Sequence, residues 1–222
     1  MTDTDLTVAV RRSQKYSYTS DQFAGPPPAK LEVGVSDPYV QMLARANQLS
    51  AGVELSAANT GVYRPDGYAT VHETTLDLSA CEATEVVLTF EVSALVDSTD
   101  TPGHFRQALA DVGAEIEVQH AGGLSTVEGR ARSVNEAYDH YTFGTGFFTD
   151  LVEAVPFTAL VEVPITVNPQ DPTASLKLRA GTLGLGLSHG IAIANAEVTL
   201  VDAAPVGTIP GPGCDLGLVK CP

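Results

Sequence analysis

The pattern in this sequence that comes nearest to a catalytic motif is Gly186-Leu187-Ser188-His189-Gly190, which has the G-x-S-x-G form of a nucleophile elbow. Such an elbow holds its serine on a sharp turn between a strand and a helix, and its histidine base comes later in the chain. Here the next segment, 191–201, alternates like a strand, and no histidine follows His189. An adjacent side chain cannot reach Ser188 as a general base, so we expect no esterase activity.

Glycines around this motif also suggest a phosphate-binding loop at first sight. Gly181, Gly184, Gly186 and Gly190 match neither the P-loop pattern nor the dinucleotide-binding fingerprint, and no strand–helix–strand unit surrounds them. Within a strand, glycines more often mark bulges or places where another backbone comes close. We therefore expect a close sheet contact here and no nucleotide.

The other candidates for catalysis or metal binding are scattered histidines and acids. Asp139-His140 would be half of a catalytic or metal pair, but no partner is identifiable, so a polar pair in a loop is the better interpretation. His120 continues the apolar row of residues 114–118 and is expected to be semi-buried and hydrogen-bonded. Glu115 and Glu117 project from the opposite strand face, which indicates a solvated face. The sequence predicts no catalytic residue, no cofactor and no metal site.

The three cysteines do not make a zinc site, because zinc needs four ligands and no Cys or His pairs supply the rest. Cys81 lies between expected strands and is interpreted as a small buried apolar side chain. Cys214 and Cys221 belong to a Gly/Pro-rich tail. They close a small loop with each other, bridge to a neighbouring chain, or stay free thiols as is usual in a reducing cytosol.

The chain is strongly acidic, with 27 acidic against 12 basic residues and a net charge of −15. A surface this negative repels nucleic acid, because phosphate binding needs lysine and arginine to displace counterions. The acidity either serves solubility or reflects a saline habitat, where screening reduces self-repulsion. The first residues lack the basic and apolar regions of a secretory signal, and no run approaches the ~20 apolar residues of a membrane span. We expect a protein that is made in a cytosol and stays soluble.

The two ends of the chain are predicted to be extended. Residues 1–30 read as an N-terminal arm that contains the stiff segment Pro26-Pro27-Pro28. Arg11, Arg12 and Lys15 form the basic cluster of this arm, which is suited to contact an acidic neighbour. Residues 203–222 read as a Gly/Pro-rich C-terminal tail of the same character.

One short helix is predicted near residues 38–50. Asp37-Pro38 resembles a helix start, with aspartate as N-cap and proline at the first helical position. Gly52 provides the stop signal. Four apolar residues recur at helical spacing in this segment: Tyr39, Leu43, Ala46 and Leu49.

Between residues 53 and 201 the apolar period changes to two, which is typical of strands. Aromatic residues make up only 6% of the chain and Trp is absent, so the core must consist of Val, Leu, Ile and Ala, which suits sheets packed face to face. We predict an all-β domain at residues 31–202, a β-sandwich of about eight strands in jelly-roll order. The expected strands include Leu31–Val35, Val71–Leu78, Val86–Val96, Thr126–Val134, Tyr138–Phe148, Thr158–Val167, Leu176–Leu187 and Ile191–Val201, together with the alternating row at 114–118.

With this strand pattern and its acidic, lysine-poor composition, the segment 31–201 resembles the single jelly-roll capsid proteins of icosahedral viruses. Among these it looks most like the small capsid proteins of membrane-containing viruses of halophilic archaea. The resemblance implies jelly rolls that stand upright, form pseudo-hexameric capsomers and enclose a lipid vesicle. It also implies that Cys214 or Cys221 links subunits, and that Arg11 and Arg12 reach a neighbour or lipid head groups.

The predicted function is therefore that of a structural virion protein without enzymatic activity. It would be synthesised in the host cytoplasm and assemble with copies of itself and other virion proteins into an icosahedral shell. It would contact no small-molecule substrate and no nucleic acid directly. Two alternatives stay open: a tail, spike or decoration protein that binds a host surface or a capsid, and a cellular β-sandwich module that binds carbohydrate or protein.

Overall fold

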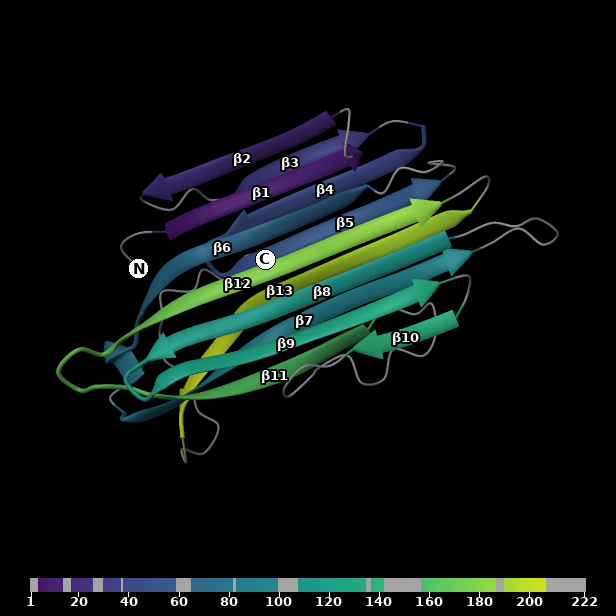
Figure 1. Ribbon diagram of the computed structural model, residues 1–222. Helices are drawn as coiled ribbons and strands as arrows, with labels where there is room; N and C mark the ends of the chain where they lie inside the picture. The colour runs from purple at the N-terminus through teal and green to yellow at the C-terminus, as the bar shows by residue number, and fades with distance from the viewer. Residues whose placement is uncertain are drawn as a thin grey trace.

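The protein is a β-sandwich of two antiparallel sheets, as Figure 1 shows for the computed structural model. The structure describes residues 4–13, 17–25, 30–36, 38–58, 65–81, 83–99, 108–134, 137–141, 157–186 and 190–206. Within these ranges the elements are β1 (Thr4–Ser13), β2 (Ser17–Gly25), β3 (Leu31–Ser36), β4 (Val40–Asn47), β5 (Ser50–Ala58), β6 (Asp66–Asp77), the 3-10 helix η1 (Ser79–Cys81), β7 (Glu85–Thr99), β8 (Ala108–His120), β9 (Gly123–Val134), β10 (Ala137–Tyr141), β11 (Phe157–Thr166), β12 (Thr173–Gly186) and β13 (Ile191–Pro205).

The strand order of the two sheets contains a complete jelly roll. The seven-stranded sheet has the order β10-β9-β8-β12-β6-β1-β2, and the six-stranded sheet has the order β11-β7-β13-β5-β4-β3. Eight of these strands pair in a nested series: β5 with β13, β6 with β12, β7 with β11, and β8 with β9. The chain thus forms one long antiparallel ribbon whose successive pairs lie alternately in the two sheets, which is the jelly-roll arrangement. This confirms the predicted fold class.

The N-terminal residues belong to the sandwich, so the prediction of a separate arm is wrong for residues 4–25. β1 pairs with β6 and extends the seven-stranded sheet, and β2 pairs with β1 at its edge. Leu6, Val8 and Val10 are fully buried in the core. Their period-two alternation is a strand signal, and the burial of this apolar row stabilises β1 by about 1.5–3 kcal/mol for each side chain.

The helix predicted near residues 38–50 is a β-hairpin made by β4 and β5. The spacing of the four apolar residues that predicted a helix is coincidental. A different set of side chains in the same segment alternates with a period of two. Every second residue from Val40 to Ala46 is buried against the opposite sheet. Asn47 makes the turn, since its Oδ1 accepts hydrogen bonds from the backbone N–H groups of Leu49 and Ser50 at 2.8 and 2.9 Å.

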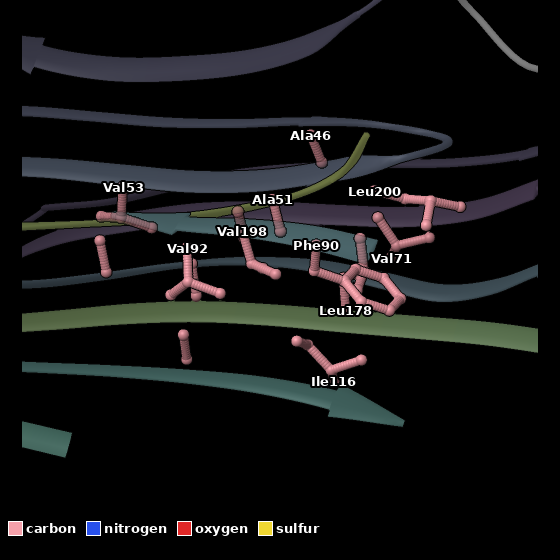
Figure 2. Close-up of a cluster of buried hydrophobic side chains, with 14 of the residues drawn as sticks. Ala46, Ala51, Val53, Val71, Phe90, Val92, Ile116, Leu178, Val198 and Leu200 are labelled. Carbon is pink, nitrogen blue, oxygen red and sulfur yellow. The ribbon is translucent and has the colours of Figure 1, made fainter. Parts of the chain in front are cut away.

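Side chains from both sheets meet in a core that consists mostly of valine, leucine and alanine, as the composition predicts. Figure 2 shows Phe90 and Val198 of the six-stranded sheet beside Leu178 and Ile116 of the seven-stranded sheet. All four are fully buried. One polar contact crosses this core: the hydroxyl groups of Ser98 and Ser133, both fully buried, lie 2.6 Å apart.

At one end of the core, two glycines let the sheets come close together. A Cβ on Gly67 would lie 2.9 Å from Cγ1 of Val53, and a Cβ on Gly184 would press on Cδ2 of the buried Leu55. Real Cβ atoms do not approach other atoms so closely. The expectation that glycines in this region mark a close sheet contact is therefore confirmed at Gly184.

The structure also corrects the predictions for Cys81 and for the start of the tail. Cys81 is buried, as expected, but it is disulfide-bonded, whereas its place between strands predicts an unbonded apolar residue. Spacing along a chain does not reveal which segments meet in space. β13 continues to Pro205, beyond the predicted domain boundary at residue 202, because Ala203 is still buried and pairs with Leu88.

Candidate functional site

The residues of the G-x-S-x-G motif lie at the junction of two strands. Gly186 is the last residue of β12, and β13 begins at Ile191, so a strand follows the motif where a nucleophile elbow requires a helix. Ser188 and His189 lie outside the described residues. Asp139 and His140 are part of the short strand β10, which pairs with β9 at the edge of the seven-stranded sheet. This confirms the strand predicted from Tyr138 onward for residues 138–141, and the interpretation of the pair as part of a loop is wrong.

His120 is half-buried and hydrogen-bonded, as the sequence predicts, and it joins the two sheets. Its Nδ1 atom accepts hydrogen bonds from the backbone N–H groups of Gly122 and Thr166, each at 3.1 Å. Its Nε2 atom lies 3.0 Å from Oγ of Ser125. Because Nδ1 accepts, the ring carries its proton on Nε2 and donates it to Ser125. The side chain thus fastens the β8–β9 turn to the end of β11.

The predicted arm contacts and cysteine links have the following positions. Arg11 lies in β1 opposite Asp66 of β6, and Arg12 follows it in the same strand. Lys15, Cys214 and Cys221 lie outside the described residues. Among the residues that the structure does describe, no group of three His, Cys, Asp or Glu side chains is placed to hold a metal ion. The same part of the chain contains no helix that is long and apolar enough to cross a membrane.

The outer face of the seven-stranded sheet carries a hollow whose floor is formed by two glycines. Gly181 of β12 and Gly113 of β8 are directly paired, and alternation along both strands turns them away from the core. The same row continues to Tyr68 of β6 on one side and to Arg130 of β9 on the other. The absence of side chains at the two central positions leaves a hollow of about 360 Å³ between the tyrosine and the arginine. We call it the outer-face hollow.

One rim of the outer-face hollow is a charged row. Arg179 stands opposite Glu115, which stands opposite Glu128. Burial raises the pKa of Glu115, and a hydrogen bond to Glu117 together with its negative charge raises it further, although the cations of Lys177 and Arg179 act in the other direction. The hydrogen bond from Lys177, at 2.7 Å, lowers the pKa of Glu117. Glu115 and Glu117 are half-buried, so the expected fully solvated face is only partly solvated.

The other rim combines an apolar side chain with an ion pair. The half-buried Leu183 lies opposite Asp111, and Asp111 lies opposite Arg132. Oδ2 of Asp111 accepts hydrogen bonds from Nε and Nη2 of Arg132 at 3.0 and 2.8 Å. By contrast, Arg130 and Arg179 are exposed, and neither forms an ion pair with any residue in the described ranges. Their guanidinium groups keep free donors toward the hollow.

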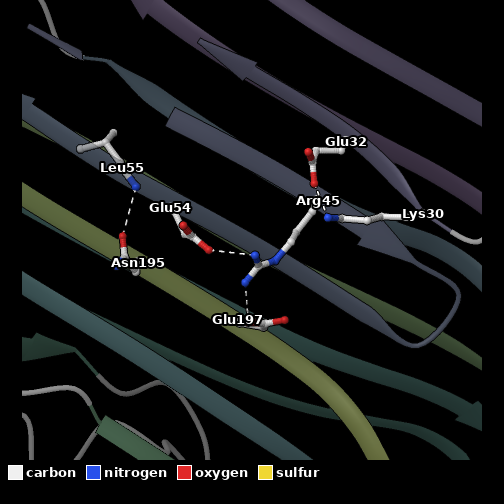
Figure 3. Close-up of polar contacts among 7 residues, drawn as sticks. All are labelled: Lys30, Glu32, Arg45, Glu54, Leu55, Asn195 and Glu197. Carbon is white, nitrogen blue, oxygen red and sulfur yellow. Dashed lines mark hydrogen bonds and ion pairs between the residues drawn. The ribbon is translucent and has the colours of Figure 1, made fainter. Parts of the chain in front are cut away.

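The outer face of the six-stranded sheet carries a charged cluster of Glu32, Glu54 and Glu197 with Arg45 and Lys30, as Figure 3 shows. Arg45 on β4 pairs with Glu54 on β5 and with Glu197 on β13, both at 2.9 Å. Burial alone would lower the pKa of Arg45, but the surrounding glutamates, including Glu32, raise it above its ordinary value. Glu54 and Glu197 therefore share the Arg45 cation, whereas Glu32 pairs with Lys30. With three carboxylates and two cations, this cluster keeps a negative charge.

The strand β11 is one edge of the six-stranded sheet, and β3 is the other. Strand β11 pairs with β7 along its whole length, and no described strand covers its other side. Leu160 in its middle is 67% exposed, more than any other large apolar side chain in the described ranges. Soluble proteins usually protect long edge strands with lysine, proline or a bulge. β11 contains neither lysine nor arginine, and its one proline, Pro164, lies near its end.

Comparisons with known proteins add little to this geometry. No family model matches the chain, and no curated protein matches it either. One solved structure with weak similarity is a carbohydrate-binding module from the β-sandwich superfamily, at 9% sequence identity over 90% of this chain and 86% of that chain. The TM-score is 0.18, too low to carry an argument about fold or function.

Proposed function

We propose that this protein is a structural virion protein, a jelly-roll subunit that assembles with copies of itself into an icosahedral shell. The observation that carries the proposal is the open edge of β11. Within the described part of the chain, residues 158–163 have no strand partner on the side away from β7, and the exposed Leu160 lies in this stretch, ahead of the interruption at Pro164. Such an edge is a template for pairing with another strand.

A second copy is the partner that fits this edge. Two β11 strands related by a twofold axis would pair antiparallel, so each copy offers the other the same surface. This contact would cover Leu160 of both copies and join two six-stranded sheets into one continuous sheet. A shell also needs further contacts, from other edges of the sandwich and from other virion proteins, and it leaves room for a lipid membrane beneath it.

The charge of the chain determines when such contacts form. Each copy carries a net charge of −15, and the cluster around Arg45 adds carboxylates to the outer face of the six-stranded sheet. At low ionic strength this charge repels a second copy. At 1 M salt the Debye length falls to ~3 Å, so the repulsion is screened while apolar contacts persist. We therefore expect assembly in molar salt, consistent with a saline habitat.

The oligomeric state of the purified protein, measured by light scattering in low salt and in molar salt, tests this proposal. We expect larger assemblies in molar salt. The Leu160→Lys variant should stay monomeric there, because it places a charge at the open edge without disturbing the core. Leu124→Lys is the matched control: Leu124 is 60% exposed but belongs to β9 of the other sheet, near the Thr166 end of β11 and not beside residues 158–163, so this variant should assemble like the unmodified chain.

Two outcomes would count against a shell subunit. A monomer at every salt concentration would exclude self-assembly of this chain, and normal assembly of Leu160→Lys would exclude β11 as the contact. A monomer would favour the alternative functions, a decoration or spike protein or a cellular binding module. The outer-face hollow is the feature that favours a binding function.

A further inference from the structure

We propose that the outer-face hollow binds a neutral saccharide. This inference does not depend on the shell function, because the hollow and the β11 edge lie on different sheets. The hollow's volume of about 360 Å³ lies within the ~300–1,000 Å³ that is usual for small-ligand pockets. It is open to solvent on the face of a rigid sheet, so a ligand can reach it without a movement of the fold.

The two floor glycines are not required by the fold itself. Among the described glycines only Gly123 has a positive φ, so neither Gly113 nor Gly181 is needed for its backbone conformation. A Cβ on Gly113 would first meet Cγ of Arg130 at 3.6 Å, and a Cβ on Gly181 would first meet the backbone oxygen of Gly67 at 3.8 Å. Both are ordinary van der Waals distances.

Glycine at these two positions therefore weakens the strands without any compensating benefit inside the protein. A glycine in the interior of a strand costs about 0.5–1 kcal/mol relative to alanine. Alanine at these positions would strengthen the strands, but it would reduce the open space above the floor of the hollow. In strands, such glycines often mark the place where a ligand approaches the backbone closely.

The groups around the floor determine the class of ligand. Arg130 and Arg179 offer hydrogen-bond donors, whereas Asp66, Glu115 and Glu128 offer acceptors, and the fourth carboxylate of the lining, Asp111, is already paired with Arg132. An anion would meet the carboxylates and a chain with a net charge of −15, and a cation would meet the two guanidinium groups. Each hydroxyl of a neutral polyol both donates and accepts, so a polyol can pair with the guanidinium groups and with the carboxylates.

The apolar part of the lining favours a sugar ring over a small linear polyol. Tyr68 closes one end of the glycine row, and Leu183 lies on the rim, so the hollow combines apolar surface with charged groups. The C–H face of a pyranose can lie against an aromatic ring while its hydroxyl groups reach the charged side chains. A neutral saccharide of one or a few rings therefore matches both the shape and the chemistry.

Isothermal titration with neutral tetrasaccharides of glucose, mannose, galactose and N-acetylglucosamine tests this inference. Sialyllactose and a chitosan tetramer serve as an anionic and a cationic probe. We expect saturable binding of at least one neutral probe and weaker binding of both charged ones. Gly181→Val, which fills the floor, and Tyr68→Ala should each weaken the binding at least tenfold.

The control variant is Tyr39→Ala, since Tyr39 is 49% exposed and precedes β4 in the other sheet, and it should bind normally. Thermal unfolding of each variant shows whether it is folded, and if Gly181→Val is not, Tyr68→Ala decides. The inference is overturned if no neutral probe binds, if a charged probe binds best, or if folded Gly181→Val and Tyr68→Ala bind like the unmodified chain. None of these results bears on assembly through β11.

Discussion

The same substitution at two glycines of one strand should change stability in opposite directions. Gly181 and Gly184 both lie in β12, three positions apart, and alternation turns Gly181 outward and Gly184 inward. In Gly184→Ala the new methyl group would press on Leu55, which is 1% exposed and packed in the core. In Gly181→Ala the new methyl group would make ordinary contacts only.

The expected magnitudes follow from two opposing contributions. Overpacking a well-packed core costs about 1–3 kcal/mol, and replacing a strand glycine by alanine recovers about 0.5–1 kcal/mol. Gly184→Ala should therefore lower the free energy of unfolding by about 1 kcal/mol, between limits of about 0 and 2.5 kcal/mol. Gly181→Ala should raise it by up to about 1 kcal/mol, since only the second contribution applies.

Urea unfolding at one fixed salt concentration, followed by far-ultraviolet circular dichroism, measures both values. If the free energy of unfolding depends equally steeply on urea concentration in both variants, both expose similar surface on unfolding. Their unfolding midpoints can then be compared directly. If Gly181→Ala is destabilised as much as Gly184→Ala, the hollow is not open space and the saccharide inference loses its basis. If Gly184→Ala is as stable as the unmodified chain, the sheets separate easily at this end and the close contact contributes little.

Three further predictions concern the core, the charged row and the disulfide. Ser98→Ala leaves the buried hydroxyl of Ser133 without its partner and should cost about 1–3 kcal/mol, and adding Ser133→Ala should recover part of this loss in urea unfolding. Because the pKa of Glu115 is raised in the folded protein, the fold is relatively more stable at low pH, where Glu115 is protonated. This stabilisation is lost as the pH rises above the ordinary pKa of 4.5. Glu115→Gln should therefore stabilise the protein by roughly 0.5 kcal/mol at pH 7, since Glu128 is directly opposite, and the gain should vanish in unfolding measurements near pH 4. Peptide mapping without reduction should find Cys81 joined to one of the two C-terminal cysteines, and reduction should lower the free energy of unfolding by ~2–4 kcal/mol; a free Cys81 thiol would contradict this.

The sequence was most informative where apolar residues alternate with the period of two that is typical of strands. The alternation of Val86–Val96 and Ile191–Val201 predicts strands, and β7 and β13 are found there. The same signal is present at Leu6, Val8 and Val10, but a short row followed by two arginines and a polyproline segment suggests an arm. At 38–50 two periods fit the same residues, and contact with the opposite sheet selects the strand.

The candidate site was not predictable from the sequence, for a geometric reason. Gly181 stood out only as one glycine among several, and Gly113, Tyr68 and Arg130 formed no motif with it. These four residues come from four strands and become neighbours only through the cross-strand register. Cross-strand pairing joins positions far apart in the chain, so no local pattern can encode it.

The sequence by itself determined the all-β class and the aliphatic core of a sandwich, because apolar periodicity and composition dictate which faces must be buried. The jelly-roll order was an expectation that the strand pairing confirms. It also determined the acidic surface. Only the tertiary structure decided which glycines face the core and which face solvent, that Cys81 is bonded, and that β11 is left at an open edge. Each of these depends on which strands become neighbours, and that follows from the packing of the whole chain.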